Sequence, residues 1–476
     1  MSVRGRGFGG MSLLSTGDIE LILGAAKKIL SQTGCKFLDP DSVEILRGLG
    51  AKVEDSGRTF IWPEMVDQAL SMAPKSIAVY DRVGKMAMEL GGEEIYFGSL
   101  TNGFKYLDPM TDRAVTLNKE HERAMVRLTD ALANIDYAMN SGTLGDCEHG
   151  YPGAEALAIV AENTTKPIGF TTNDFESCRE AVALAEALVG GAEKLGERPF
   201  IIHYAEPISP LVHSLEACLK LKFFAQKAIP ITYTPYVMMG GTGPMSFAAV
   251  LAQVFAEMLA GLVLHQAVRP GAPFIMGGMP AYLEMRHSIG VMGAPELHLL
   301  IAASAEVAKS LKLPFFGTAG CSDSPVLDLQ AAAEVTMSLM SALLSPAHLI
   351  HDLGLMGHGE STSPATLVLC DELIGLLAPF RKGLVVNEKT LALEVIDQVG
   401  PGGHFLTHQH TLANFRLLTF SKLLDRTRTF LGTTLDERIR AKTTELLRTH
   451  KPEPLTQEQA VIMADFRAKW RETKEK

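Results

Sequence analysis

The sequence predicts an α/β protein built on a (β/α)8 barrel of the TIM type. Apolar runs of four to seven residues recur about eight times, and each leads through a polar or glycine-containing end into a long helical segment. Such alternation of strands and helices implies a parallel sheet. The number of units and their near-even spacing favour a closed barrel over an open sheet. We therefore expect an N-terminal cap at residues 1–94, the barrel at 95–365 and a C-terminal helical extension at 366–476.

The expected cap combines helices with a small antiparallel sheet. Amphipathic segments at residues 12–34 and 39–49 predict two helices, and Trp62 precedes a third that has Pro in its first turn, where the missing N–H costs nothing. Alternating residues at 76–81 and 86–90 predict two short strands.

The expected barrel strands share an apolar core and, in several cases, an initial Pro, which suits the first residue of a strand. They lie at residues 95–98, 136–141, 167–172, 199–204, 230–234, 273–277, 314–318 and 347–352. In a closed parallel barrel the carboxyl ends of all strands share one rim, where barrel enzymes carry their chemistry. The last two strands, with the loops up to Glu360, are expected to form the floor of the site.

Composition limits the class of protein. The chain has 476 residues and a net charge of −10, which argues against nucleic acid or an anionic membrane as a partner. We find no apolar run of the roughly eighteen residues that a membrane span needs, and no signal-peptide core. Six scattered cysteines without a CxxC pair indicate free thiols in a reducing cytoplasm. The helical cap and extension are compatible with a homo-oligomer.

Polar and aromatic side chains gather at the predicted strand ends. The candidate site residues are Tyr96, Phe97, Asn140, Tyr204, Glu206, Tyr233, Thr318, His348, His351 and Asp352. Because neighbouring strand residues face opposite ways, we expect at most one of His351 and Asp352 to point into the barrel. For each histidine a core position with a backbone hydrogen bond is an equally good interpretation.

We assign no metal site. His404, His408 and His410 have a spacing that resembles a ligand cluster, but they follow Gly400-Pro-Gly-Gly and lie outside the repeat. A turn followed by a helix start is the better prediction there. An alternative function nevertheless stays open, in which the barrel is a metal-dependent lyase or hydrolase that uses Asp323, His351 and Asp352.

Several motifs, taken in order, resemble the trimethylamine methyltransferase family over about residues 10–450. They are Asp81-Arg82, Glu216-Ala-Cys-Leu-Lys, Gly320-Cys-Ser-Asp, His351-Asp-Leu-Gly and Gly400-Pro-Gly-Gly-His-Phe-Leu. Archaeal members of that family carry pyrrolysine after a late barrel strand, near 319–322 in this numbering. All 476 residues here are ordinary amino acids, so the chain looks like the non-pyrrolysine branch.

That resemblance implies methyl transfer from a quaternary amine, glycine betaine first, to Co(I) of a corrinoid (cob(I)alamin) carried by a small partner protein that docks over the barrel mouth. It implies substrate contacts from Tyr96, Phe97, Tyr204, Tyr233, Thr318 and His348, with His348 on the carboxylate. It implies a corrinoid-facing rim of Asn140, Glu206, His351 and Asp352. We assign no catalytic side chain, and a non-enzymatic protein that binds quaternary amines is the remaining alternative.

Overall fold

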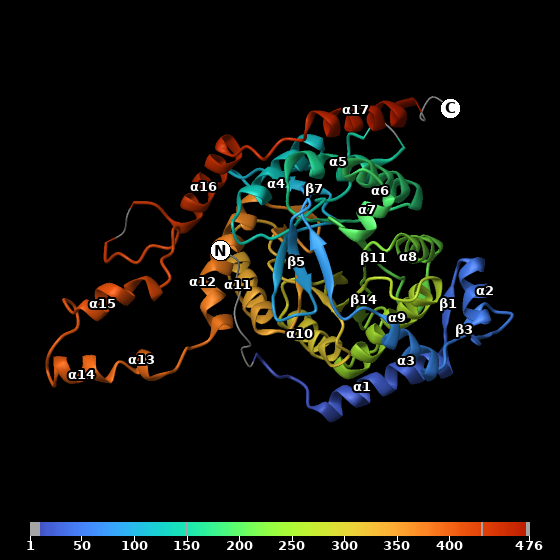
Figure 1. The fold of residues 1–476 in the computed structure, drawn as a ribbon, viewed down its shortest axis with the longest axis horizontal. Coiled ribbons are helices and arrows are strands. Elements are labelled where there is room, and N and C mark those ends of the chain that lie inside the picture. The colour runs from blue at the N-terminus through green and yellow to red at the C-terminus, as the bar shows by residue number, and fades with distance from the viewer. Residues whose placement is uncertain (1–9, 148–149, 430–431, 473–476) are drawn as a thin grey trace.

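A closed eight-stranded parallel barrel forms the centre of the protein, as the sequence predicts (Figure 1). The computed structural model describes residues 10–147, 150–429 and 432–472. Every predicted barrel segment overlaps one strand, and the strands follow the order β6-β19-β18-β15-β13-β11-β10-β9. A parallel bridge between Gly98 and Tyr137 closes the barrel between its first and last strands. The strands are β6 (Tyr96–Ser99), β9 (Ala138–Met139), β10 (Ile168–Phe170), β11 (Ile201–Ala205), β13 (Ile231–Tyr233), β15 (Phe274–Gly277), β18 (Phe315–Thr318) and β19 (Leu349–Leu353).

Helices surround the barrel. They are α4 (Lys119–Ala131), α5 (Pro152–Asn163), α6 (Phe175–Val189), α8 (Leu215–Lys227), α9 (Phe247–Val268), α10 (Pro295–Ser310), α11 (Leu329–Leu344) and α12 (Pro364–Lys382), with the short α7 (Ala192–Glu197) after α6. Local sequence signals start many of them: the side chains of Asp174, Ser214 and Asp328 accept N-cap bonds, which satisfy otherwise unpaired N–H groups.

Short strands extend the loops that follow the barrel strands. They are β7 (Lys105–Leu107), β8 (Ala114–Thr116), β12 (Val212–His213), β14 (Tyr236–Met239), β16 (Met279–Glu284), β17 (Ile289–Gly290), β20 (Leu355–Met356) and β21 (Ser361–Thr362). Pairing of β14 with β16, and of β21 with β7, ties these loops together at the carboxyl end of the barrel.

Helix α9 corrects one expectation from the sequence. Its 22 residues are apolar enough, by length and composition, to cross a membrane, although no apolar run of that kind was expected. In the structure 83% of its most apolar window is buried, because α1, α3 and α8 pack around it. A helix that is apolar on all sides needs such a complete covering.

The cap has two parts. The first part is α1 (Thr16–Lys28), η1 (Ile29–Thr33), α2 (Pro40–Gly48), α3 (Pro63–Met72) and the strands β1 (Cys35–Phe37), β2 (Lys52–Val53) and β3 (Arg58–Phe60). The second part is the hairpin of β4 (Ile77–Tyr80) and β5 (Met86–Leu90). Its apolar residues, including Val79 and Met88, share a cluster with Tyr96 and Leu349 from the barrel interior. The hairpin therefore closes the amino-terminal end of the barrel.

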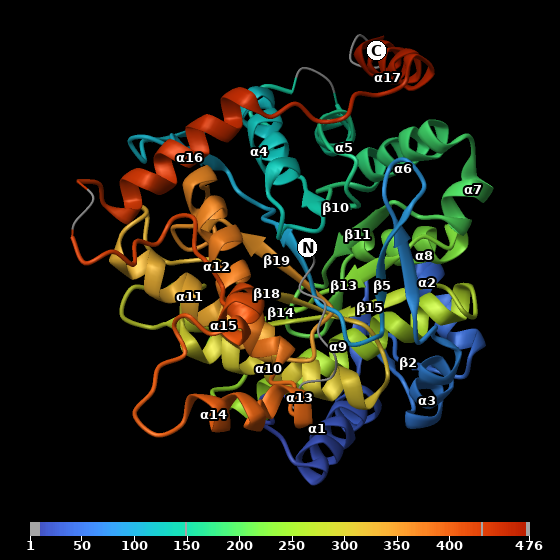
Figure 2. The same ribbon diagram turned by 60° about the vertical axis from the view of Figure 1, so that its left-hand side comes forward.

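The C-terminal extension runs back over the outside of the barrel (Figure 2). It contains α13 (Glu388–Leu391), α14 (Leu393–Val399), α15 (Gln409–Asn414), η2 (Phe415–Leu417), α16 (Leu435–Thr449) and α17 (Gln457–Glu472). Arg467 in α17 pairs with Glu155 and Glu162 of α5. Arg82, from the Asp81-Arg82 motif, donates to Thr164 O and to Glu453 O. These contacts fasten the C-terminal extension to α5 and to the turn of the cap hairpin.

Candidate functional site

Three polar side chains meet inside the barrel at the carboxyl ends of β18 and β19. Thr318 and His351 are register partners across the two strands, and Thr318 Oγ1 lies 3.1 Å from His351 Nδ1. The same nitrogen lies 3.3 Å from Asp352 Oδ2. All three residues are buried, so the sequence-predicted Thr318, His351 and Asp352 form one cluster.

The expectation that His351 and Asp352 face opposite ways is wrong. Strict alternation holds only in a regular strand, and the pairing of β19 with β6 shifts register between Ile350 and Leu353. Asp352 has φ of 71° within this irregularity, a left-handed conformation that a non-glycine residue adopts rarely. Because the backbone turns there, the carboxyl group of Asp352 comes back to the imidazole of His351.

Aromatic rings surround this cluster. The ring of Phe316 meets the ring of His351 edge-on at 4.3 Å between centroids, and the ring of Tyr204 lies 5.7 Å from it. The hydroxyl of Tyr137 donates to Ile350 O at 2.9 Å. Gly98 makes room for Tyr137, since a Cβ at that position would lie 2.2 Å from the tyrosine ring. The interior near β18 and β19 is therefore lined by aromatic side chains.

Burial changes the ionisation of the two titratable groups in the cluster. It raises the pKa of Asp352 to about 7, while hydrogen bonds from the Thr318 side chain and the Thr101 backbone act in the opposite direction. It lowers the pKa of His351 to about 3. The imidazole is therefore neutral at pH 7 and the carboxyl group is partly ionised, so their contact joins an uncharged ring to a partly ionised carboxyl group.

Glu206 extends the site toward solvent. The hydroxyl of Tyr204 donates to Glu206 Oε2 at 3.2 Å and lies 3.9 Å from the sulfur of Met279. Glu206 reaches solvent, but the surrounding protein still raises the pKa of its carboxyl group by partial desolvation. A line of groups thus runs from Asp352 inside the barrel, past Tyr204, to Glu206 at the mouth.

Three other candidates have different surroundings. Asn140 uses its side-chain oxygen to accept from Thr171 N at 2.9 Å and thereby links β9 to β10 beyond their last backbone pair. Phe97 and Tyr233 belong to the cluster between barrel and helices, and the hydroxyl of Tyr233 lies 2.7 Å from His213 Nδ1. These three side chains do not join the group around His351.

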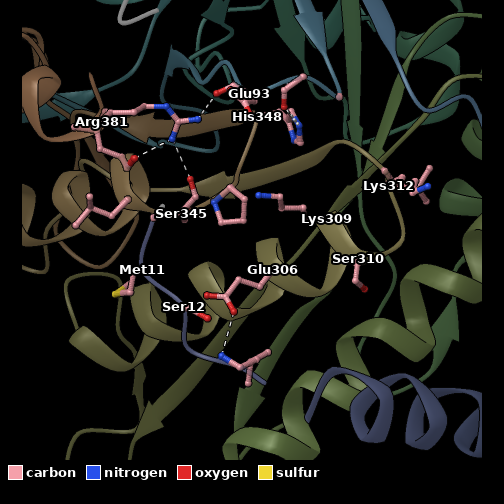
Figure 3. Close-up of a pocket in the computed structure, with 18 of the residues that line it drawn as sticks. Met11, Ser12, Glu93, Glu306, Lys309, Ser310, Lys312, Ser345, His348 and Arg381 are labelled. Carbon is pink, nitrogen blue, oxygen red and sulfur yellow. Dashed lines mark hydrogen bonds between the residues drawn. The ribbon is translucent and has the colours of Figure 1, made fainter. Parts of the chain in front are cut away.

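His348 and Tyr96 lie at the other end of the barrel. The Nδ1 of His348 accepts from Phe315 N at 3.1 Å, and its Nε2 lies 3.1 Å from Gly92 O. The hydroxyl of Tyr96 accepts from Glu89 N in the cap hairpin. His348 also borders a cavity of about 760 Å³ at this end, together with Lys309 (Figure 3). The structure therefore separates His348 from the cluster at the carboxyl end.

Sequence reasoning missed Phe316 and Tyr137. Both signals were present, because Phe316 shares its strand face with Thr318, and Tyr137 shares its strand face with Met139. For Phe316 the available pattern was an aromatic residue two positions before a polar strand end, and for Tyr137 it was the alternation that places it on the same face as Met139.

The loop after β18, which includes residues 319–322, is tied to α11. Ser322 Oγ donates to Glu334 Oε2, and Gly320 N donates to Ser338 Oγ at 3.0 Å. Asp323, which the metal-dependent alternative requires, instead contacts His358 Nδ1 at 3.1 Å. Over residues 10–147, 150–429 and 432–472, no three metal-ligating side chains converge.

The region of His404, His408 and His410 contains the predicted turn and helix start. His408 is the N-cap residue of α15, and its side chain accepts from His410 N at 3.0 Å.

Comparison with known proteins gives a consistent result. The chain is 30% identical over 410 residues to the glycine betaine methyltransferase of Desulfitobacterium hafniense strain Y51, with 85% of each chain covered. It is 27% identical over 469 residues to the trimethylamine methyltransferase MttB of D. hafniense strain DSM 10664 / DCB-2, with 97% of this chain and 94% of the other covered. A trimethylamine methyltransferase MttB of Methanosarcina barkeri is 29% identical over 429 residues and covers 87% of this chain and 85% of its own.

The fold agrees with a solved structure. The monomethylamine methyltransferase MtmB of M. barkeri superposes with a TM-score of 0.51 over 98% of this chain and 89% of its own, at 10% sequence identity. The sequence profile described as trimethylamine methyltransferase (MTTB) matches residues 3–474. That match spans nearly the whole chain, and this protein belongs to the trimethylamine methyltransferase family.

Proposed function

We propose that this methyltransferase moves a methyl group from a quaternary amine, glycine betaine first, to Co(I) of a corrinoid on a partner protein. The observation that supports this most directly is the aromatic and acidic interior around Tyr204, Phe316 and Asp352. The relative named glycine betaine methyltransferase is 30% identical to this chain. No pyrrolysine stands in the sequence, and a quaternary ammonium has no lone pair with which to add to an imine.

The cation is held by ring faces and by negative charge. A quaternary ammonium accepts no hydrogen bond, and each aromatic face contributes about 0.5–2 kcal/mol, depending on desolvation. Tyr204 is the central ring in this proposal, because it lies between His351 and Glu206. The polarisable sulfur of Met279 lies beside its hydroxyl. Asp352 and Glu206 add negative charge at either end.

Methyl transfer removes charge from the substrate. Co(I) supplies the electron pair for the new bond to the methyl carbon, the C–N bond breaks, and its electron pair stays on nitrogen as dimethylglycine leaves. A fully ionised carboxylate beside the ammonium would stabilise the substrate more than the transition state. Burial disfavours the ionised form of Asp352, and the free energy needed to ionise this carboxyl group in the complex offsets part of that ground-state stabilisation. The work of this chain is then to position one methyl group toward the mouth.

The corrinoid partner docks, in this proposal, on the loops that follow the barrel strands. Large apolar side chains are exposed on several of these loops. They are Phe104, Ile208, Met245 and Met285, and Phe247 is exposed at the start of α9. Exposed apolar side chains around the barrel mouth are suited to binding a partner protein. That partner must cover the mouth during methyl transfer and then dissociate. No nucleic acid or membrane is part of the proposal.

The test mixes the full chain with free cob(I)alamin and glycine betaine and follows methylcobalamin by its visible spectrum. Formation of methylcobalamin and dimethylglycine in equal amounts supports the reaction. Proline betaine, carnitine, choline and trimethylamine form the substrate panel. Tight binding of a quaternary amine without transfer to free or protein-bound corrinoid would support the binding-protein alternative instead. Activity that depends on added zinc or manganese, without corrinoid, would support the lyase or hydrolase alternative.

A further inference from the structure

The cavity of about 760 Å³ at the amino-terminal end of the barrel lies away from the cluster around His351 (Figure 3). Five parts of the chain meet around it. They are the residues around the start of α1, the loop after β5, the end of α10, the segment that joins α11 to β19, and the end of α12. Small-molecule sites have volumes of about 300–1,000 Å³. The proposed methyl transfer takes place at the other end of the barrel, so this cavity has no part in it.

Lys309 and Lys312 bring two ammonium groups to the cavity. Figure 3 shows the amine of Lys309 pointing toward the side of the cavity that Ser345 and Arg381 form. Among the described residues, neither lysine amine has a hydrogen-bond acceptor or a carboxylate within bonding distance. A lysine in the last turn of a helix interacts favourably with the helix dipole, but that interaction does not require the amine to face a cavity.

Arg381 forms another wall, and part of its guanidinium group is available. Its Nη1 donates to Leu343 O at 2.9 Å and to Ser345 O at 3.1 Å, and its Nη2 donates to Glu93 O. These bonds use three of the five N–H groups of an arginine, and the described residues offer no acceptor to the other two. Burial lowers the pKa of Arg381, because it removes water from the charged group. An anion in the cavity would compensate for that loss of water.

The two carboxylates beside the cavity leave an excess of positive charge. Glu306 accepts from Leu13 N at 2.8 Å and from Leu14 N at 3.1 Å, with one oxygen for each. Its charge is thus directed at the backbone before α1. Glu93 is exposed, so water and salt screen its charge. This positive cavity belongs to a chain whose net charge is −10.

The imidazole of His348 experiences this positive field. Burial is the main cause of its lowered pKa of about 4, and the charges of Arg381 and Lys309 lower it further. Two cations from different helices, α10 and α12, therefore act on the same space.

We propose that this cavity binds an organic phosphate, with Lys309 and Arg381 on its phosphate oxygens. A phosphate monoester carries a charge of about −1.5 to −2 at pH 7, so one group can engage both cations, whereas a carboxylate carries a single charge. Lysine binds phosphate as a point charge, and the planar guanidinium group matches the geometry of phosphate oxygens. Apolar side chains, among them Ile19, Leu313 and Leu344, line other parts of the cavity and suit the organic body of the ligand.

The test measures binding to the full chain by titration calorimetry in magnesium-free buffer. Pyrophosphate, ADP and ATP are the phosphate probes, adenosine is an organic body without phosphate, and citrate is a polyanion without phosphate. We expect the phosphate probes to bind at millimolar concentration or below. Adenosine and citrate should bind at least about tenfold more weakly, because they lack the charge-assisted bonds to phosphate oxygens.

Charge variants examine the role of Lys309. Lys309→Glu should weaken binding of the phosphate probes about tenfold or more, because it replaces an attracting charge with a repelling one. Lys309→Arg keeps the charge and should keep the affinity. Lys28→Glu is the matched control, because Lys28 is also exposed and lies in the last turn of its helix. The same charge change therefore acts on a helix end, away from the cavity, and should leave binding unchanged. Circular dichroism checks that each variant is folded.

Hydrogen exchange locates the ligand. With ATP bound we expect slower exchange over residues 10–14 and 343–348, which border the cavity, while the affinity for glycine betaine stays the same. Failure of every phosphate probe to bind would overturn the proposal. So would phosphate binding that Lys309→Glu leaves intact, or citrate or adenosine binding as tightly as ATP. Protection confined to the loops at the carboxyl end of the barrel would place the ligand elsewhere and also overturn it.

Discussion

The Nδ1 of His351 lies 3.3 Å from Oδ2 of Asp352, although the two residues are neighbours in one strand. The left-handed backbone of Asp352 makes this contact. It brings a carboxyl group, an imidazole and the hydroxyl of Thr318 together inside the barrel. Backbone strain of this kind persists where the surrounding structure holds it, and it is found often at functional sites.

Binding of a quaternary amine should depend on the ionisation of Asp352. Burial raises the pKa of this carboxyl group to about 7, and a bound cation favours the ionised form and lowers that pKa. Affinity for glycine betaine should therefore increase up to about tenfold between about pH 6 and about pH 8. Titration calorimetry in buffers of different ionisation enthalpy should detect proton release. Asp352→Asn should bind more weakly and without pH dependence; proton uptake by the wild type would contradict the assignment.

The same group makes the opposite contribution to stability. The pKa of Asp352 is raised from 3.8 in the unfolded chain to about 7 in the folded protein, so the folded state binds more protons between these values. Stability contributed by this site is therefore greatest below about pH 4 and decreases as pH rises toward 7. Thermal unfolding of wild type and Asp352→Asn across this range checks the sign. A wild type that loses stability relative to Asp352→Asn as the pH falls would be evidence of a lowered pKa.

Tyr204 should contribute to substrate binding through its ring. Tyr204→Leu removes the aromatic face and should weaken binding of glycine betaine about 2- to 30-fold, as expected for a loss of about 0.5–2 kcal/mol. Tyr204→Phe keeps the face, loses the hydroxyl with its contacts to Glu206 and the sulfur of Met279, and should bind nearly as the wild type does. Tyr233→Phe is a control outside the barrel interior. Equal affinity of the leucine and phenylalanine variants would remove the ring from the cation site.

His348 should act on stability. Both of its ring nitrogens are engaged, one by the buried Phe315 N and the other by the carbonyl oxygen of Gly92, an exposed residue, and truncation removes both of these bonds. His348→Ala should lower the free energy of unfolding by about 1–3 kcal/mol, with KM for the methyl donor unchanged in the folded fraction. Denaturant titration and steady-state kinetics measure the two quantities. An increased KM at unchanged stability would return His348 to the substrate site.

Gly98 should be irreplaceable by alanine. The added methyl group would meet the ring of Tyr137 at 2.2 Å, and the ring cannot move without breaking its bond to Ile350 O, next to His351. Gly98→Ala should lose about 1–3 kcal/mol of stability and much of the methyl-transfer rate. Gly24→Ala, on α1 with open space around its Cβ position, is the control and should be neutral or slightly stabilising. Wild-type rates in Gly98→Ala would show that the position of Tyr137 is unimportant.

Local signals in the sequence are sufficient to predict the barrel. Apolar runs, Pro at strand starts, and capping residues such as Asp174 and Asp328 are local signals, and a chain that repeats them about eight times has few ways to bury its strands other than closure. Thr318 and Tyr204 could be placed inside by alternation, since β18 and β11 are regular. The motifs, in order, also indicated the family.

Which side chains meet inside the barrel depends on how the strands are assembled and cannot be inferred from local patterns. Alternation fails at Asp352, because a shift of register cannot be read from neighbouring letters. Closure brings Tyr137 across to Ile350, although the two are far apart in the chain. His348 and His351 are three residues apart in one segment, yet the direction of β19 places them at opposite ends of the barrel. Local patterns determine the strands, but the ends and faces of a strand acquire their partners only when all eight are assembled.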